Sequence, residues 1–177
     1  MFERILVATD GSDHANKAVD VAADLAVKYD GRLTILHILG HQELSDDLLH
    51  AARMEHLVEP SRQPPLAAAN VPGNLAAVWR DAEQKITAAN KIYPLLGENI
   101  LTHAKERAID RGVSRNSVET AMKNGEPAEQ ILKHAEQEDN DTIILGSRGL
   151  GNIKGLLMGS VSHKVSHLAK QTCITVK

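Results

Sequence analysis

The sequence predicts an α/β fold, an open parallel sheet with helices on both faces. Short apolar runs alternate with helical patterns along most of the 177 residues, which is typical of strand–helix–strand units. The run at 5–8 is continuously apolar, as in a strand that is buried on both faces. A glycine-rich segment, 146–160, directly follows another apolar run at 143–145. Glycines in such a loop let the backbone approach a ligand closely.

Composition excludes several classes of protein. The chain is 42% hydrophobic and 24% charged, which is ordinary for one globular domain, so we expect a single domain over 1–177. A net charge of −3 leaves no electrostatic footprint for nucleic acid. No apolar run is long enough for membrane insertion, and the early first strand leaves no room for a signal peptide. The single Cys173 rules out an internal disulfide and favours the reducing cytoplasm.

The first elements follow from the apolar pattern and from turn residues. After the strand at 5–8, the turn sequence at 9–12 leads into a helix over about 15–29, which has one apolar stripe. Asp30 and Gly31 end this helix, and 33–39 is predicted as the second strand.

The second half of the chain continues the alternation. Pro127 suits the first turn of a helix, because its missing N–H has no partner there in any case. Right-handed crossovers between parallel strands leave few topologies. The remaining predicted elements are helices at 100–109, 127–138 and 160–170 and strands at 118–122, 142–145 and 173–176.

Residues 40–97 are too many for one connection and are predicted as a helical and loop insertion. An amphipathic helix is predicted at 44–54, followed by a proline-punctuated loop. Asn74 would then cap a second helix running towards Ile92. Two interpretations stay open: a lid or partner surface, or an irregular excursion without special function, since loops tolerate insertions well.

The glycine-rich segment fits none of three familiar motifs. No glycine precedes a Lys-Ser or Lys-Thr pair, so a P-loop is excluded. Gly149 and Gly151 begin a G-x-G-x-x-G pattern, but Gly155 comes one residue too late, and the segment follows a late strand rather than the first. The G-x-S-x-G elbow of α/β hydrolases is also missing.

What remains is Gly146-x-x-Gly149-x(9)-Gly159-Ser160, after a strand that begins next to Asp141. Together with Ile5-Leu6-Val7-Ala8-Thr9-Asp10-Gly11-Ser12, it closely resembles the nucleotide-binding branch of the universal stress protein family. The resemblance covers 1–39 and about 94–177. It implies a five-stranded parallel sheet in the order 3-2-1-4-5, of the adenine nucleotide alpha hydrolase-like kind, with the insertion after strand 2. Ligands of such sheets bind outside the carboxyl ends of the strands where the order reverses, here between strands 1 and 4.

The resemblance implies that ATP binds in this crevice. Backbone N–H groups near Gly149 and Gly159 would meet the triphosphate, Gly146 would lie against the ribose, and Arg148 would meet phosphate. The metal would be Mg²⁺, or Mn²⁺ in its place, held by phosphate oxygens and water rather than by side chains. The predicted nucleotide-binding residues are Ala8, Thr9, Asp10, Ile38, Leu145, Gly146, Arg148, Gly149, Gly159, Ser160, Val161 and Ser162.

Several of these residues have a plainer interpretation. Ser160 could simply cap its helix, and Asp10 could form an Asx turn. Arg148 could be a solvated loop charge. His163 and His167 lie four residues apart, but no third ligand accompanies them, which disfavours a zinc site. Cys173 is interpreted as an inert core thiol.

No general base with a positioned partner is evident, so no catalytic residue is named. We therefore expect an ATP-binding module of stress response or regulation, with at most slow hydrolysis. Two alternatives stay open: an interaction protein whose nucleotide site is vestigial, and a true ATP-consuming enzyme. The resemblance also implies a homodimer formed through the last strand, 173–176, whose free edge invites pairing. The protein partner is not identified.

Overall fold

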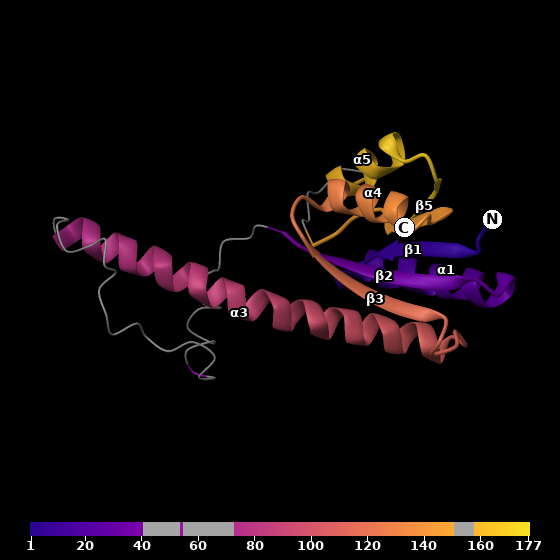
Figure 1. Ribbon diagram of the computed structural model, residues 1–177, viewed down its shortest axis with the longest axis horizontal. Coiled ribbons are helices and arrows are strands. Elements are labelled where there is room, and N and C mark those ends of the chain that lie inside the picture. The colour runs from indigo at the N-terminus through magenta and orange to yellow at the C-terminus, as the bar shows by residue number, and fades with distance from the viewer. Residues whose placement is uncertain (41–53, 55–72, 151–157) are drawn as a thin grey trace. The chain divides into compact units, whose positions relative to one another are not determined.

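The computed structural model describes residues 1–40, 54, 73–150 and 158–177. Five parallel strands form one sheet in the order β3-β2-β1-β4-β5, which confirms the predicted fold (Figure 1). The strands are β1 (Arg4–Ala8), β2 (Arg32–Leu39), β3 (Val118–Asn124), β4 (Thr142–Gly146) and β5 (Thr172–Val176).

The chain divides into two compact units. The first unit comprises Met1–Gly40 and Gly97–Lys177 and holds the whole sheet, and the second is His41–Leu96. The bounds of the second unit lie one residue inside the predicted insertion, 40–97. Apart from Met54, the predicted helix at 44–54 lies outside the described residues, as does nearly all of the proline-punctuated loop.

β1 is the central strand, which explains its continuous apolar run. Val7 pairs with Ile35 of β2 on one side and with Ile144 of β4 on the other. Ile5 and Leu6 are fully buried, like Val7. Alternate side chains of a strand point to opposite faces, so both faces of β1 must be covered.

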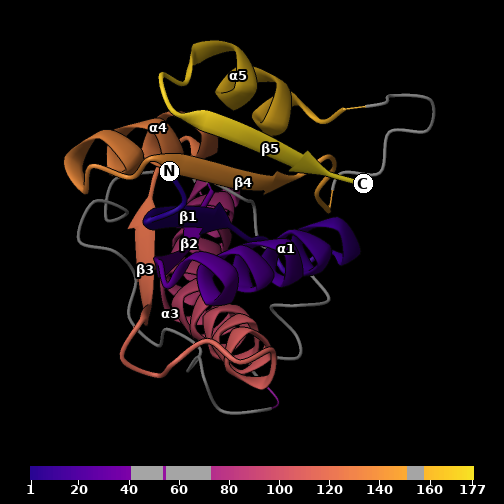
Figure 2. The same cartoon turned by 90° about the vertical axis from the view of Figure 1, so that its right-hand side faces the viewer.

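Helices cover both faces of the sheet (Figure 2). The face of Ile5 and Val7 packs against α1 (Asp13–Tyr29) and against the part of α3 (Gly73–Asp110) that carries Leu101, Ala104 and Ala108. The face of Leu6 packs against α4 (Pro127–Gln137) and α5 (Ser160–Leu168). Both cores are aliphatic, as the scarcity of aromatic residues predicts.

Local capping sets the bounds of α1 and α4. The Ser12 hydroxyl accepts the Ala15 N–H at 3.3 Å, so α1 begins before the predicted position. It ends at Asp30, whose φ of 54° is left-handed. Glu126 caps α4, and Pro127 is its first residue, as predicted.

α3 corrects the prediction of two separate helices. It is continuous from Gly73 to Asp110, with Pro94 inside it. Asn74 lies within the helix and therefore does not cap it. Proline removes one backbone hydrogen bond from a helix interior, yet α3 continues past Pro94. In the part of the chain that the structure describes, no helix combines the length and the apolar character needed to cross a membrane.

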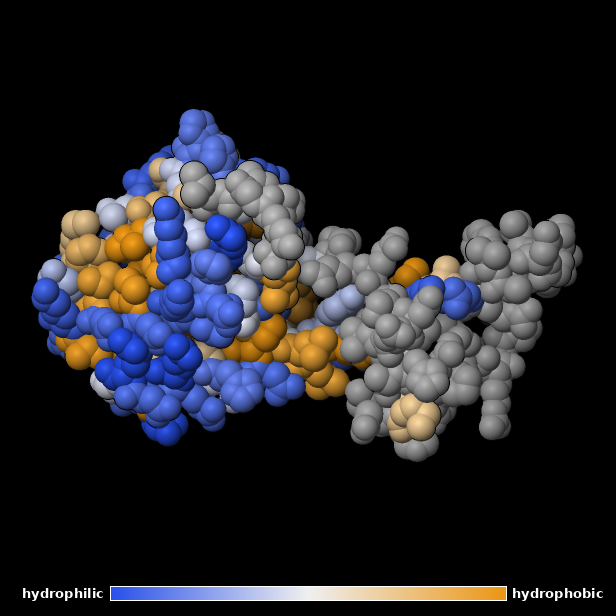
Figure 3. Space-filling view, turned by 180° about the vertical axis from the view of Figure 1, so that it is seen from behind, coloured by the Kyte–Doolittle hydropathy of each residue, from blue (hydrophilic) through white to orange (hydrophobic). Residues whose placement is uncertain are grey.

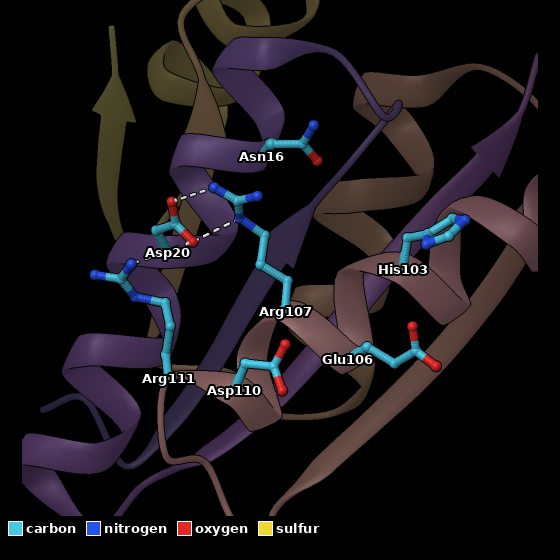
Figure 4. A pocket seen from close by; sticks show the side chains of 7 residues that line it. All are labelled: Asn16, Asp20, His103, Glu106, Arg107, Asp110 and Arg111. Atoms are coloured by element: carbon cyan, nitrogen blue, oxygen red, sulfur yellow. Dashed lines mark hydrogen bonds and ion pairs between the residues drawn. The ribbon is translucent and has the colours of Figure 1, made fainter.

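Ion pairs join α1 to the end of α3. Arg107 donates from Nε and Nη2 to the two Asp20 oxygens, both at 2.6 Å, and Arg111 makes the same forked contact with Asp24. The hydrogen bonds with Arg111 hold the pKa of Asp24 below its ordinary value. The hydrogen bonds with the aspartates hold the pKa values of Arg107 and Arg111 above theirs. A polar hollow of about 420 Å³ lies beside the Asp20–Arg107 pair (Figure 4). On the face in Figure 3, hydrophilic and apolar residues are interspersed over the first unit.

Candidate functional site

The predicted site lies where β1 and β4 end side by side. Ala8 and Leu145 pair across these strands, and the chain leaves the sheet at Thr9 and after Gly146. β1 leads to α1 on one face of the sheet, whereas β4 leads to α5 on the other. The two connections therefore diverge here, as at the ligand-binding switch points of open α/β sheets.

The apolar members of the predicted set gather on one face of the sheet. Leu145 is buried in the cluster that packs against α4 and α5, and Ala8, Ile38 and Val161 lie partly buried against the same cluster. Segments that are far apart in the sequence thus meet at this edge. Their partial exposure leaves apolar surface beside the ends of the strands.

Asp10 contacts two backbone segments. Its Oδ1 accepts the Ser12 N–H at 3.0 Å, which confirms the Asx-turn interpretation. Its Oδ2 accepts the Leu150 N–H at 2.9 Å. The carboxylate therefore joins the end of β1 to the glycine-rich segment.

Sequence reasoning missed His37, whose side chain contacts the backbone of Thr9. The His37 Nδ1 lies 2.8 Å from the Thr9 carbonyl oxygen, and both residues are buried. Because a carbonyl oxygen only accepts, Nδ1 must carry the hydrogen. The Thr9 N–H donates to the Leu36 carbonyl oxygen at 2.9 Å, so both backbone groups of Thr9 are occupied. A histidine within the apolar run at 33–39 was the only signal.

Gly146 is close to the start of α1. A Cβ at this position would lie 2.7 Å from the His14 carbonyl carbon and 2.8 Å from the Ala15 nitrogen. These are backbone atoms that cannot yield, so the packing of β4 against α1 already requires glycine here. The predicted contact of Gly146 with a ribose stays a prediction.

Ser147, which sequence reasoning also missed, connects β4, β5 and α5. Its N–H donates to the Val176 carbonyl oxygen at 2.6 Å, and its own carbonyl oxygen accepts the Gly159 N–H at 2.7 Å. The buried Ser162 hydroxyl lies 3.0 Å from the carbonyl oxygens of Ser147 and Gly159. Ser162 thus connects the first turn of α5 to the residue that follows β4.

The start of α5 carries no capping side chain. Its N-cap is Gly159, and Ser160 is the first helical residue, so the interpretation of Ser160 as the cap is wrong. Ser160 is exposed and Val161 half-buried. The first N–H groups of a helix have no partner within the helix and carry partial positive charge. This helix start can therefore accept an anion.

Arg148 lies half-buried beside this helix start. Its Nε is buried, and it has no hydrogen-bond partner among the described residues. A buried guanidinium N–H without a partner is costly unless an acceptor meets it. This observation weighs against the interpretation of Arg148 as a solvated loop charge.

Other features of the described residues lie away from this edge. A second hollow of about 400 Å³ is lined by residues of α3 and β3, such as Leu101 and Thr120. His163 and His167 are exposed, with nearly parallel rings 6.4 Å apart. Within the described ranges, no group of three His, Cys, Asp or Glu residues could hold a metal ion. Burial raises the pKa of the Cys173 thiol.

Comparison with known proteins shows the same family over the whole chain. The model of the universal stress protein family matches residues 1–177. The universal stress protein YxiE of Bacillus subtilis (strain 168) is 36% identical over 173 residues, which cover 98% of this chain and 96% of YxiE.

Solved structures share the fold. The universal stress protein UspA from Lactobacillus plantarum matches with a TM-score of 0.62 and 20% identity, over 99% of this chain and 98% of that one. A universal stress protein from Archaeoglobus fulgidus in complex with dAMP matches with a TM-score of 0.55 and 19% identity. The match covers 98% of this chain and 97% of that one. The family match, the identity to YxiE and the strand order agree. The chain therefore belongs to the universal stress protein family.

Proposed function

We propose that this protein binds ATP at the carboxyl ends of β1 and β4. The apolar surface at Ala8 and Ile38 would receive the adenine, and the start of α5 would receive the phosphates. The dAMP complex of the Archaeoglobus fulgidus relative supports an adenine nucleotide as the ligand. The buried Arg148 Nε, which has no hydrogen-bond partner among the described residues, supports an anion beside the same helix.

The observation that carries the proposal is Gly159. Its φ of −75° is open to any residue, so conformation does not require glycine. Among the described residues, the nearest atom to a Cβ at this position would be the Ser147 carbonyl oxygen, 3.5 Å away, which is an ordinary van der Waals contact, so their packing does not require glycine either. Serine, asparagine or aspartate would cap α5 better. A ligand that approaches the backbone closely is a reason for glycine that the described residues do not supply.

A divalent ion fits this site only as part of the nucleotide complex. Asp10 is the one carboxylate in the predicted set, and both of its oxygens already accept backbone N–H groups. Mg²⁺ retains several waters and binds phosphate oxygens readily. We therefore assign Mg²⁺, or Mn²⁺ in its place, to the phosphates, where it would neutralise charge.

Within this proposal the protein is a nucleotide-dependent module of stress response, working in the cytoplasm with at most slow hydrolysis. The described site offers no side chain placed as a general base for an attacking water. Steady-state ATP turnover separates this function from an ATP-consuming enzyme. Absence of binding would favour the interaction protein with a vestigial site.

The proposal is tested by calorimetric titration of the protein and of Gly159→Ala with ATP and Mg²⁺. A new methyl group at the closest point of backbone approach should weaken binding about tenfold or more, which is about 1.4 kcal/mol. The variant should still fold, because alanine in place of the N-cap glycine costs about 0.5–1 kcal/mol of stability.

Glu126→Ala provides the matched control. It removes the capping side chain of α4, which accepts the Glu129 N–H at 3.1 Å. Its stability should fall about as much as that of Gly159→Ala, whereas its affinity for ATP should be unchanged. Equal affinity of Gly159→Ala and the unmodified protein would overturn the site.

A further inference from the structure

The two nucleotide-site glycines that follow Gly146 differ in their surroundings. A Cβ at Gly159 would make only ordinary van der Waals contacts with the described residues, as given above. A Cβ at Gly149 would instead clash with the Asp10 Oδ2, closer than real Cβ atoms approach an oxygen. Gly149 itself is exposed, so the solvent side does not exclude a side chain.

The Asp10 carboxylate has little freedom to move away from Gly149. Its Oδ1 is held by the Ser12 N–H, and its Oδ2 is held by the Leu150 N–H. Hydrogen bonds from N–H groups to an ionised carboxylate are stronger than neutral ones. A side chain at residue 149 would therefore break at least one of these two bonds or displace the loop.

We propose that Asp10 is a positioning residue, which pins the loop 147–150 to the end of β1, and that residue 149 is glycine to make room for that carboxylate. The nucleotide is then not what excludes a side chain at position 149. In the nucleotide-free protein Asp10 holds the Leu150 N–H, and with it the adjoining backbone, in place. The effect on affinity rests on the proposed function, whereas the effect on the loop does not.

The first test is a double-mutant cycle of ATP affinity with Asp10→Ala, Gly149→Ala and the double variant. Contacting residues typically couple by 0.5–3 kcal/mol, so Gly149→Ala should weaken binding about tenfold when Asp10 is present. In the Asp10→Ala background the clash is gone, and the same substitution should change affinity by less than about twofold. If Gly149→Ala weakened ATP binding by the same factor with and without Asp10, the nucleotide itself would require the glycine. That result would overturn the proposal.

The second test uses the nucleotide-free protein and reads hydrogen exchange of the Leu150 amide. Asp10→Ala removes its acceptor, so exchange should accelerate about tenfold or more, and Asp10→Asn should accelerate it less, because one oxygen still accepts. Asp13→Ala is the control, since Asp13 is an exposed carboxylate in the first turn of α1 and should leave this amide unchanged.

The two tests separate the proposals. If the unmodified protein does not bind ATP, the proposed function fails, and the exchange rate alone then decides on Asp10. Unchanged exchange of the Leu150 amide in Asp10→Ala would overturn the positioning role whether or not ATP binds.

Discussion

Two aspartates at opposite ends of the parallel strands bind backbone N–H groups. Asp10 acts at the carboxyl ends of the strands. Asp141 acts where β1 begins, and its oxygens accept the N–H groups of Phe2, Glu3 and Arg4 at 3.0, 2.9 and 3.2 Å. Burial alone would raise the pKa of Asp141, but the hydrogen bonds from the Thr142 hydroxyl and these N–H groups outweigh it and lower the pKa.

Asp141→Asn should therefore destabilise the protein at pH 7 by about 1–2 kcal/mol, because the amide cannot accept all of these hydrogen bonds. The folded pKa is depressed, so the contribution of the carboxylate is full above the unfolded pKa of about 3.9 and is lost as pH falls through the folded pKa. Urea unfolding at several pH values should show the difference between the two proteins shrinking on acidification.

Asp139→Asn is the control for this substitution. Asp139 is exposed, and its Oδ2 lies 3.8 Å from the Arg4 Nη1 in a surface ion pair. Its left-handed φ of 49° suits asparagine equally well. If Asp139→Asn lost as much stability as Asp141→Asn, the role assigned to Asp141 would be contradicted. The same holds if the stability difference between Asp141→Asn and the unmodified protein did not depend on pH.

At single residues, the sequence could locate the glycine-rich segment but not the reason for each glycine. A Cβ at Gly146 would meet the backbone of α1 and one at Gly149 would meet a carboxylate, whereas one at Gly159 would make only ordinary van der Waals contacts with the described residues. These neighbours come from distant parts of the chain, and spacing alone contains no information about them. The hydrogen bond of His37 to Thr9 was hidden for the same reason, because the two residues are 28 positions apart in the sequence.

Among the elements, helices with local stop signals were predicted well, whereas the extent of α3 was not. Asp30 ends α1 by its own backbone conformation, and Pro127 begins α4. In α3, the sequence predicted one helix running towards Ile92 and another at 100–109, an interruption that the structure does not have. Single-residue propensity is a weak guide when a long helix is considered as a whole.

The ion pairs between α1 and α3 give a prediction for these elements. Arg107→Ala should lower stability modestly, with a coupling to Asp20→Ala of about 0.5 kcal/mol, because the pair is forked but Arg107 is nearly half exposed. Thermal unfolding of the double-mutant cycle at low and high salt measures this coupling, which salt should reduce.

Lys170→Ala provides a comparison within the same protein. Lys170 contacts Glu136 through a single 2.9 Å bond, and both side chains are largely exposed. We expect Lys170→Ala to lower stability less than Arg107→Ala does. A larger effect at Lys170 would show that the forked geometry is not what makes the α1–α3 pairs contribute.

For the whole molecule, we propose a homodimer formed through β5. This strand lies at one edge of the sheet, so one row of its backbone groups is not paired within the sheet. Cys173, Ile174 and Val176 are only partly buried. Pairing with a second copy would satisfy both features.

Thr175→Lys should convert this dimer to a monomer, because a charge on an edge strand opposes pairing. Sedimentation equilibrium measures the mass directly. Thr120→Lys is the matched control, since Thr120 lies on β3 at the opposite edge, and it should leave the mass unchanged. A monomeric unmodified protein, or a dimer that only Thr120→Lys disrupts, would contradict pairing through β5.

The strand order also has a consequence for synthesis on the ribosome. β1 is made first, but its neighbour β4 begins only at Thr142, and β5 follows at Thr172. Until β4 has emerged, a nascent chain holds β1 with one edge unpaired, and such edges are prone to mispairing. We therefore expect the growing polypeptide to depend on chaperones until β4 has emerged, and truncated chains that end before β4 to aggregate.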